Sequence, residues 1–109
     1  MPTRPDTLQG SLPLLVLTVL HRRGPLHGYA ITSHIHSLSD ALRVEEGSLY
    51  PCLHRMEEAG WIRAHTITTE HNRRARAYDV TAVGRRQLDL EEARRRSVTD
   101  AVNHVLKHA

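Results

Sequence analysis

Residues 47–60 read GSLYPCLHRMEEAG, and this stretch decides the fold of the chain. Its large apolar residues follow the i, i+4, i+7 spacing of one helix face: Leu49, Leu53 and Met56. We predict a helix over 48–59 whose first turn contains Pro51, where a missing N–H has little effect. Ser48 is expected to cap the start of this helix, and Gly60 to end it in a left-handed conformation.

The opposite face of this helix carries polar and cationic side chains. They are Ser48, Pro51, His54, Arg55 and Glu58, with Cys52 at the edge. A helix anchored by one apolar stripe, with a partly cationic outer face, suits insertion into the major groove of DNA. An ordinary solvated helix has the same pattern, so the choice between the two depends on the rest of the chain.

The length and composition indicate one small, basic domain. The 109 residues can bury a modest core, and the net charge of +3 with a sequence pI of about 9.6 favours a polyanionic partner. The single cysteine, Cys52, excludes a disulfide within the chain and fits a reducing cytosol. The apolar run over 12–20 is too short to span a bilayer, which requires roughly 18 residues. We therefore expect a cytoplasmic protein without a membrane partner.

Hydrophobic periodicity and turn residues divide the remaining chain into helices and one hairpin. The expected order is a flexible arm (1–8), a helix (9–23), a helix (27–38), the central helix (48–59), a strand (61–69), a strand (75–80) and a last helix that Thr81 caps. Three helices followed by a hairpin form a winged helix-turn-helix, a mainly α fold whose small β-hairpin is the wing. We assign residues 1–81 to a DNA-binding domain and residues 82–109 to a C-terminal helix that follows it.

Two apolar surfaces lack an evident partner within one chain. The helix over 9–23 is apolar nearly all round, with Leu14 and Leu17 on the side away from its main face. The last helix carries an apolar stripe with one neighbouring residue: Val98, Ala101, Val102, Val105 and Leu106. In so small a chain, a partner subunit could cover the outer side of the first of these helices.

The turn of the hairpin is rich in arginine, since Arg73, Arg74 and Arg76 place three guanidiniums within four residues. A thin, projecting hairpin of this kind can reach into a minor groove or along phosphates. Alternatively, a charged turn only prevents edge-to-edge pairing of strands. Beside a helix-turn-helix, DNA contact is the favoured interpretation. Tyr29 and Tyr50 lie near the starts of their helices, where a hydroxyl could meet a phosphate or the ring could simply pack.

The sequence contains no constellation typical of an enzyme or a metal site. Apart from His104 and His108 near the C-terminus, the nine histidines include no pair at helical ligand spacing. No base or oxyanion donor can be assigned to Cys52 as a nucleophile. The arginines of the last helix alternate with carboxylates and form a solvated face. We expect no catalytic activity, no cofactor and no metal.

Three segments closely resemble the PadR family of bacterial transcriptional regulators: 26–31 (LHGYAI), 44–62 (VEEGSLYPCLHRMEEAGWI) and 73–84 (RRARAYDVTAVG). They match the HGY helix start, the G-[TS]-L-Y-P start of the recognition helix, the basic wing and the Y-x-[LV]-T-x-x-G sequence that leads into the last helix. The resemblance extends over residues 10–88 and is to the short branch of the family, which has a single C-terminal helix.

The resemblance implies a homodimeric winged-helix repressor, associated with the bacterial nucleoid, whose last helix (82–109) is the dimerisation helix. We then expect the two apolar surfaces described above to form the dimer interface. It further implies a pseudo-palindromic operator and a small-molecule or stress signal that releases the DNA. Some short relatives hold flat aromatic drugs between tryptophans of the dimer helices. The last helix of this chain has no tryptophan, so we do not expect that mode of binding.

The residues expected to contact DNA are Tyr29, Ser48, Tyr50, Pro51, His54, Arg55, Arg73, Arg74 and Arg76. The alternative is a winged helix that binds a protein partner without reading DNA, since this fold also serves as a platform for proteins. The salt dependence of DNA binding separates the two, because contacts with phosphates release counterions.

Overall fold

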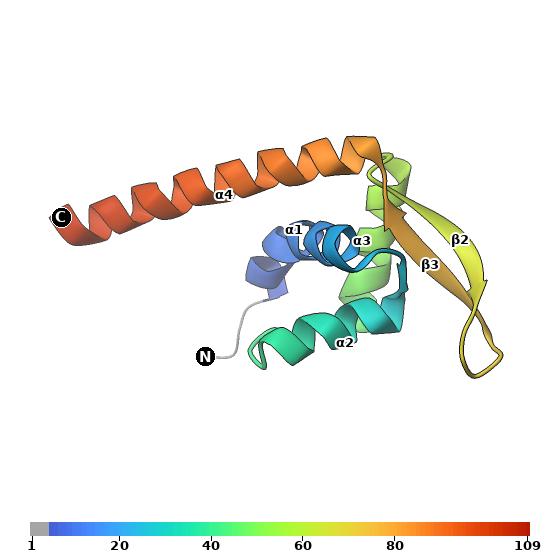
Figure 1. Ribbon diagram of the computed structural model, residues 1–109. Coiled ribbons are helices and arrows are strands. Elements are labelled where there is room, and N and C mark those ends of the chain that lie inside the picture. Colours follow the sequence, from blue (N-terminus) through green and yellow to red (C-terminus); the bar gives the residue numbers. More distant parts are fainter. Residues whose placement is uncertain (1–4) are drawn as a thin grey trace.

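The computed structural model describes residues 5–109, with side chains from residue 10 onwards. The elements are α1 (Pro5–Arg23), β1 (Leu26–His27), α2 (Gly28–Leu38), α3 (Glu46–Glu58), β2 (Ile62–Thr68), β3 (Arg74–Val80) and α4 (Ala82–His108). Figure 1 shows the three shorter helices beside the first half of α4. The β2–β3 hairpin projects from the side of the molecule where α4 begins, far from the C-terminus. The predicted winged helix-turn-helix fold with a long C-terminal helix is confirmed.

The first helix begins earlier than the sequence pattern indicated. The expected arm over 1–8 ends at α1, which starts at Pro5 rather than at residue 9. The rest of that arm, residues 1–4, lies outside the described residues. Pro13 lies inside α1, and Gly24, the first residue after the helix, adopts φ +80°.

The core lies where α1 meets α2, α3, β3 and α4. The apolar stripe predicted for the central helix is confirmed, since Leu49, Leu53 and Met56 are all buried. Leu17 is also fully buried, at 0% exposure, because α1 is surrounded by elements of its own chain. The prediction that Leu17 belongs to a dimer interface is therefore wrong, as its side chain offers no surface to a second subunit.

The central helix α3 starts two residues before the predicted position. Its N-cap is Glu45, whose carbonyl accepts hydrogen bonds from the backbone N–H groups of Ser48 and Leu49 at 3.0 and 2.9 Å. Ser48 is thus already inside the helix and does not cap it. Pro51 lies in the second turn rather than the first, and the helix continues through it with one backbone hydrogen bond fewer.

The end of α3 follows the prediction. Gly60 has φ +80°, and its backbone N–H bonds the carbonyl of Glu57 at 3.0 Å. The N–H of Trp61 then bonds the carbonyl of Met56 at 2.9 Å, which completes a Schellman motif. This motif turns the chain directly from α3 into β2.

The sheet has three strands, one more than the predicted hairpin. Its order is β1-β3-β2 and both pairings are antiparallel. Residues 26–27 pair with Tyr78 and Ala77 of β3, so this short strand ties the start of α2 to the wing. At the hairpin tip, Asn72 adopts φ 60° and donates its backbone N–H to the carbonyl of Thr69 at 2.9 Å.

The start of α4 is fixed to the end of α3. Thr81 caps α4 as predicted, its hydroxyl accepting from the N–H of Gly84 at 3.0 Å. The backbone N–H of Thr81 also bonds the carbonyl of Trp61 at 3.0 Å, and Gly84 packs directly against that carbonyl. Leu88 is the last buried side chain of α4, and the remainder of the helix extends away from the core (Figure 1).

Candidate nucleic-acid interface

The exposed face of α3 carries most of the side chains predicted for it. Tyr50, Pro51, His54 and Arg55 are exposed, and Ser48 is half-buried. The imidazole Nε2 of His54 lies 3.1 Å from a carboxylate oxygen of Glu58, one helical turn away. The outer face of α3 therefore exposes the phenol ring of Tyr50, the imidazole of His54 and the guanidinium of Arg55 to solvent.

The sequence had indicated that Cys52 lies at the edge of this face, but the structure places it in the core. Its side chain is 1% exposed, and its thiol contacts the sulfur of Met56 at 3.5 Å. Burial raises the pKa of the thiol, an effect that the nearby Arg55 charge opposes. A buried and protonated thiol is unreactive, so Cys52 acts as a packing residue.

Tyr50 connects α3 to the start of α2. A Cβ atom at Gly28 would lie 2.7 Å from the Tyr50 hydroxyl and 3.0 Å from the adjacent ring carbon. The absence of a side chain at Gly28 thus lets the ring lie against the first turn of α2. Because its side chain is 45% exposed, Tyr50 combines this packing with access to solvent.

The start of α2 faces solvent beside the wing. The His27 Nδ1 atom caps the helix by accepting from the N–H of Ala30 at 3.2 Å. Tyr29 is 70% exposed, and its ring is roughly parallel to that of His27 with centroids 6.5 Å apart. His27 is thus the N-cap of α2, whereas the sequence predicted it as the first helical residue and indicated no role for its side chain.

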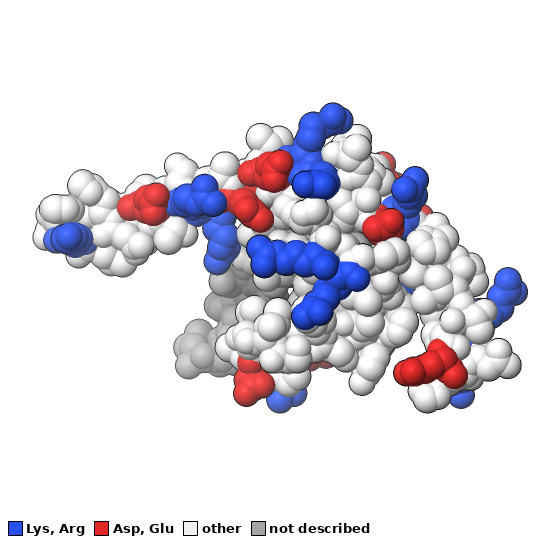
Figure 2. All heavy atoms as spheres, in the orientation of Figure 1, with Lys and Arg blue, Asp and Glu red and all other residues white. Residues whose placement is uncertain are grey.

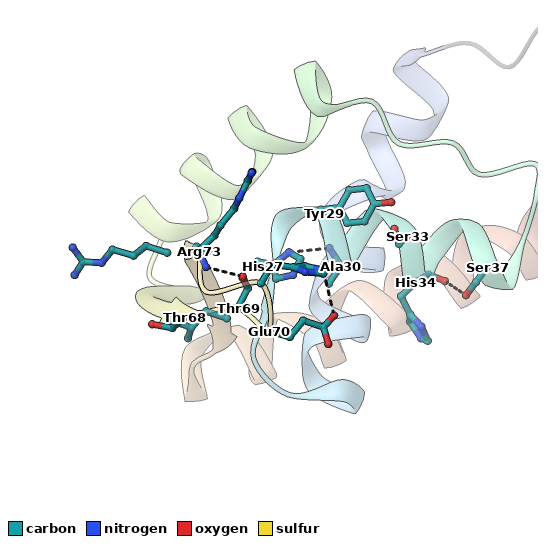
Figure 3. Close-up of a pocket in the computed structure, with 14 residues that line it drawn as sticks. His27, Tyr29, Ala30, Ser33, His34, Ser37, Thr68, Thr69, Glu70 and Arg73 are labelled. Atoms are coloured by element: carbon teal, nitrogen blue, oxygen red, sulfur yellow. Dashed lines mark hydrogen bonds and ion pairs between the residues drawn. The ribbon is translucent and has the colours of Figure 1, made fainter.

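A broad groove of about 1360 Å³ separates the start of α2 from the tip of the wing. Figure 3 shows Tyr29, Ser33 and His34 on the α2 side, opposite Thr68, Thr69 and Arg73 of the hairpin. Arg73 and Arg74 are both exposed at this wall. The Thr69 hydroxyl accepts from the backbone N–H of Arg73 at 3.2 Å, which holds the tip in shape.

Arg76 differs from the two arginines at the tip. One of its guanidinium nitrogens lies 2.8 Å from a carboxylate oxygen of Glu57 in α3. This ion pair joins β3 to α3 across 19 residues of sequence. Among the ion pairs of the described residues, Arg76 has a carboxylate partner, whereas Arg73 and Arg74 have none. That all three arginines meet DNA stays a prediction.

The charges on α4 have a different character from those of the wing. Figure 2 shows acidic and basic atoms alternating along this helix. Arg94 lies 2.9 Å from Glu91, one turn earlier, and Arg95 donates to the hydroxyl of Ser11 in α1 at 3.0 Å. These contacts agree with the predicted solvated face.

Two further properties bear on the class of protein. Within the part of the chain that the structure describes, no three histidine, cysteine or carboxylate side chains gather as potential metal ligands. None of the described helices combines the length and apolar character needed to cross a membrane.

Comparison with known proteins gives consistent matches. Residues 16–90 match the sequence family described as "Transcriptional regulator PadR-like family". No curated protein sequence matches the chain significantly.

Several solved structures have the same fold. A PadR family transcriptional regulator from Eggerthella lenta is 27% identical, with a TM-score of 0.82 over 95% of this chain and 88% of that chain. A transcriptional regulator from Clostridium thermocellum is 24% identical, with a TM-score of 0.81 over 91% and 96% of the two chains. A PadR-like regulator from Bacillus cereus is 24% identical, with a TM-score of 0.80 over 95% and 99%.

The family match covers the helices α2 and α3, the wing and the start of α4, which are the elements that form the interface described above. The chain therefore belongs to the PadR-like family and is a DNA-binding transcriptional regulator.

Proposed function

We propose that this protein is a homodimeric repressor that binds a pseudo-palindromic operator. The observation that carries the proposal is the position of the exposed wing arginines across an open groove from α2, together with the polar side chains that α3 exposes to solvent. The side chains at α2 and α3 that we assign to DNA contact are Tyr29, Ser48, Tyr50, Pro51, His54 and Arg55. Arg73 and Arg74 bind phosphates or enter the minor groove.

The proposed dimer interface uses the distal half of α4. Val98, Val102, Val105 and Leu106 leave 50–76% of their surface exposed, although they form one apolar stripe. Ala101 is exposed between them. Such a stripe is covered when the same helix of a second subunit packs against it.

The first helix contributes to the same surface through Leu14. This residue is half-buried and lines two small grooves between α1 and α4, of about 290 and 270 Å³. Val98 lines the first of these grooves. Side chains of a second subunit can fill such hollows, so the proposed interface consists of Leu14 and the α4 stripe, without Leu17.

The attachment of α4 to α3 links dimerisation to DNA recognition. Because Thr81 and Gly84 pack on Trp61, three residues after the end of α3, a change in the direction of α4 should shift α3 as well. Two α4 helices held together then place two α3 helices about 34–36 Å apart, in successive major grooves. We propose that a small-molecule or stress signal releases DNA by changing the packing between α1 and α4.

Replacing Arg73 and Arg74 together with alanine tests the DNA contact. We expect weaker binding to duplex DNA of every sequence, by about tenfold or more at moderate salt, and a slope of log K against log salt that is smaller by about 2. The measurement is fluorescence anisotropy with labelled duplex DNA across a series of salt concentrations.

The matched control replaces Arg85 and Arg86 of α4, which removes the same charge from a helix outside the proposed interface. This control should leave the slope nearly unchanged. Equal slopes for wild type and the wing variant would contradict the DNA contact of the wing. A wild-type protein without any salt dependence would instead support the alternative of a protein-binding module.

A further inference from the structure

Arg76 and Glu57 form the single side-chain bridge between wing and central helix among the ion pairs of the described residues. The Glu57 side chain is 32% exposed and that of Arg76 is 61% exposed, so the carboxylate is the more enclosed partner. Glu57 lies in the last turn of α3, next to the buried Met56, where the helix holds its backbone firmly. The ion pair therefore connects β3 of the projecting hairpin to the last turn of α3.

A buried tyrosine lies beside this bridge. Tyr78 is two residues after Arg76 on β3, so both side chains point to the same face of the sheet. Burial raises the pKa of Tyr78, while the Arg76 charge lowers it and the charges of Glu57 and Tyr50 raise it. Arg76 and Tyr78 of β3 therefore lie close to Glu57 of α3. Tyr50, also on α3, contacts Gly28 at the start of α2.

We propose that Arg76 is a positioning residue, which holds the wing at one angle to α3, and that it does not contact DNA itself. The tip of the wing and the outer face of α3 have to meet the same duplex, so their relative angle decides whether both can bind at once. An exposed ion pair contributes little to global stability. Its effect here is to restrict the orientation of the hairpin relative to α3.

This inference rests on the proposed DNA-binding function. It predicts that Glu57→Gln changes the affinity for DNA in the opposite direction from the one expected if Arg76 contacted a phosphate. Glu57→Gln removes one negative charge and frees Arg76, so a direct contact would give tighter binding to any DNA. If Arg76 positions the wing, Glu57→Gln weakens binding to a duplex selected by the wild-type protein, by about two- to fivefold. Arg76→Gln produces a similar loss without lowering the salt slope, whereas removal of a phosphate contact lowers it by about 1.

The control for DNA binding is Asp89→Asn, which removes the same charge from an exposed position of α4, outside the wing and the residues assigned to DNA contact. We expect Asp89→Asn to leave binding unchanged or slightly stronger. The control for hydrogen exchange in the free protein is Glu58→Gln, because the Glu58 carboxylate pairs with His54 instead of the wing. The double variant Glu57→Gln with Arg76→Gln should bind no more weakly than either single variant, since both remove one bridge.

Backbone hydrogen exchange of the free protein provides a test that does not depend on DNA. Glu57→Gln and Arg76→Gln should speed amide exchange in β2 and β3, and Glu58→Gln should not. Unchanged exchange in the hairpin, or tighter DNA binding by Glu57→Gln, would overturn the positioning role. Failure of the wild-type protein to bind DNA would contradict the proposed function alone, because the exchange result stands separately.

Discussion

Val102→Asp should convert the protein into a monomer that binds its operator at least about 100-fold more weakly than wild type. Val102 lies within the apolar stripe of α4 and is 50% exposed. In a dimer the substitution would bury two carboxylates against apolar side chains, which strongly disfavours association. The loss of affinity follows because two DNA-binding domains joined in a dimer bind far more tightly than one.

Sedimentation equilibrium at micromolar concentration measures the first part of this expectation, and anisotropy with operator DNA measures the second. Val83→Asp is the matched control, since Val83 is 45% exposed on the same helix but lies near its start, away from the stripe. The control should remain dimeric. A Val102→Asp variant that sediments as a dimer would remove the proposed interface.

Gly84→Ala should destabilise the fold by about 2–4 kcal/mol, a large fraction of the stability of a small domain. A methyl group at this position would collide with the backbone carbonyl of Trp61, which cannot move without disturbing the Schellman turn after α3. The same carbonyl accepts the hydrogen bond from the Thr81 N–H. The variant therefore disturbs the junction that links α3 to α4.

Urea or thermal unfolding followed by circular dichroism measures this effect. Gly47→Ala is the control, because no atom lies within 4 Å of a Cβ added there and alanine favours the helix. This control should be as stable as wild type or more stable by up to about 1 kcal/mol. If Gly84→Ala unfolds at the wild-type midpoint, the tight packing of α4 on Trp61 is not a source of stability.

The features of the central helix that could be predicted from sequence depend on local spacing. The stripe of Leu49, Leu53 and Met56 and the stop at Gly60 are properties of a few consecutive turns, and the structure confirms them. The start of the helix was misplaced because Glu45 and Glu46 add no apolar periodicity, while Ser48 is a favourable capping residue. A strand as short as β1 has no alternating pattern by which to recognise it.

Other features depend on contacts between distant residues and leave no pattern in the sequence. Leu17 looked available to a partner because α1 is apolar all round, but its side chain is fully buried in a helix that contacts four other elements of the same chain. Arg76 resembled its neighbours Arg73 and Arg74, yet only the folded chain brings Glu57 to it. The reason for a glycine at position 84 likewise became visible only when Trp61 was placed beside it.

Selection of duplex DNA from a random library by the purified protein, followed by sequencing of the retained fragments, tests whether two copies of the chain recognise one operator. We expect enrichment of an inverted repeat whose half-site centres lie about one helical turn apart, bound by two copies of the chain. Retained fragments without a common sequence, or with a single half-site bound by one copy, would contradict it.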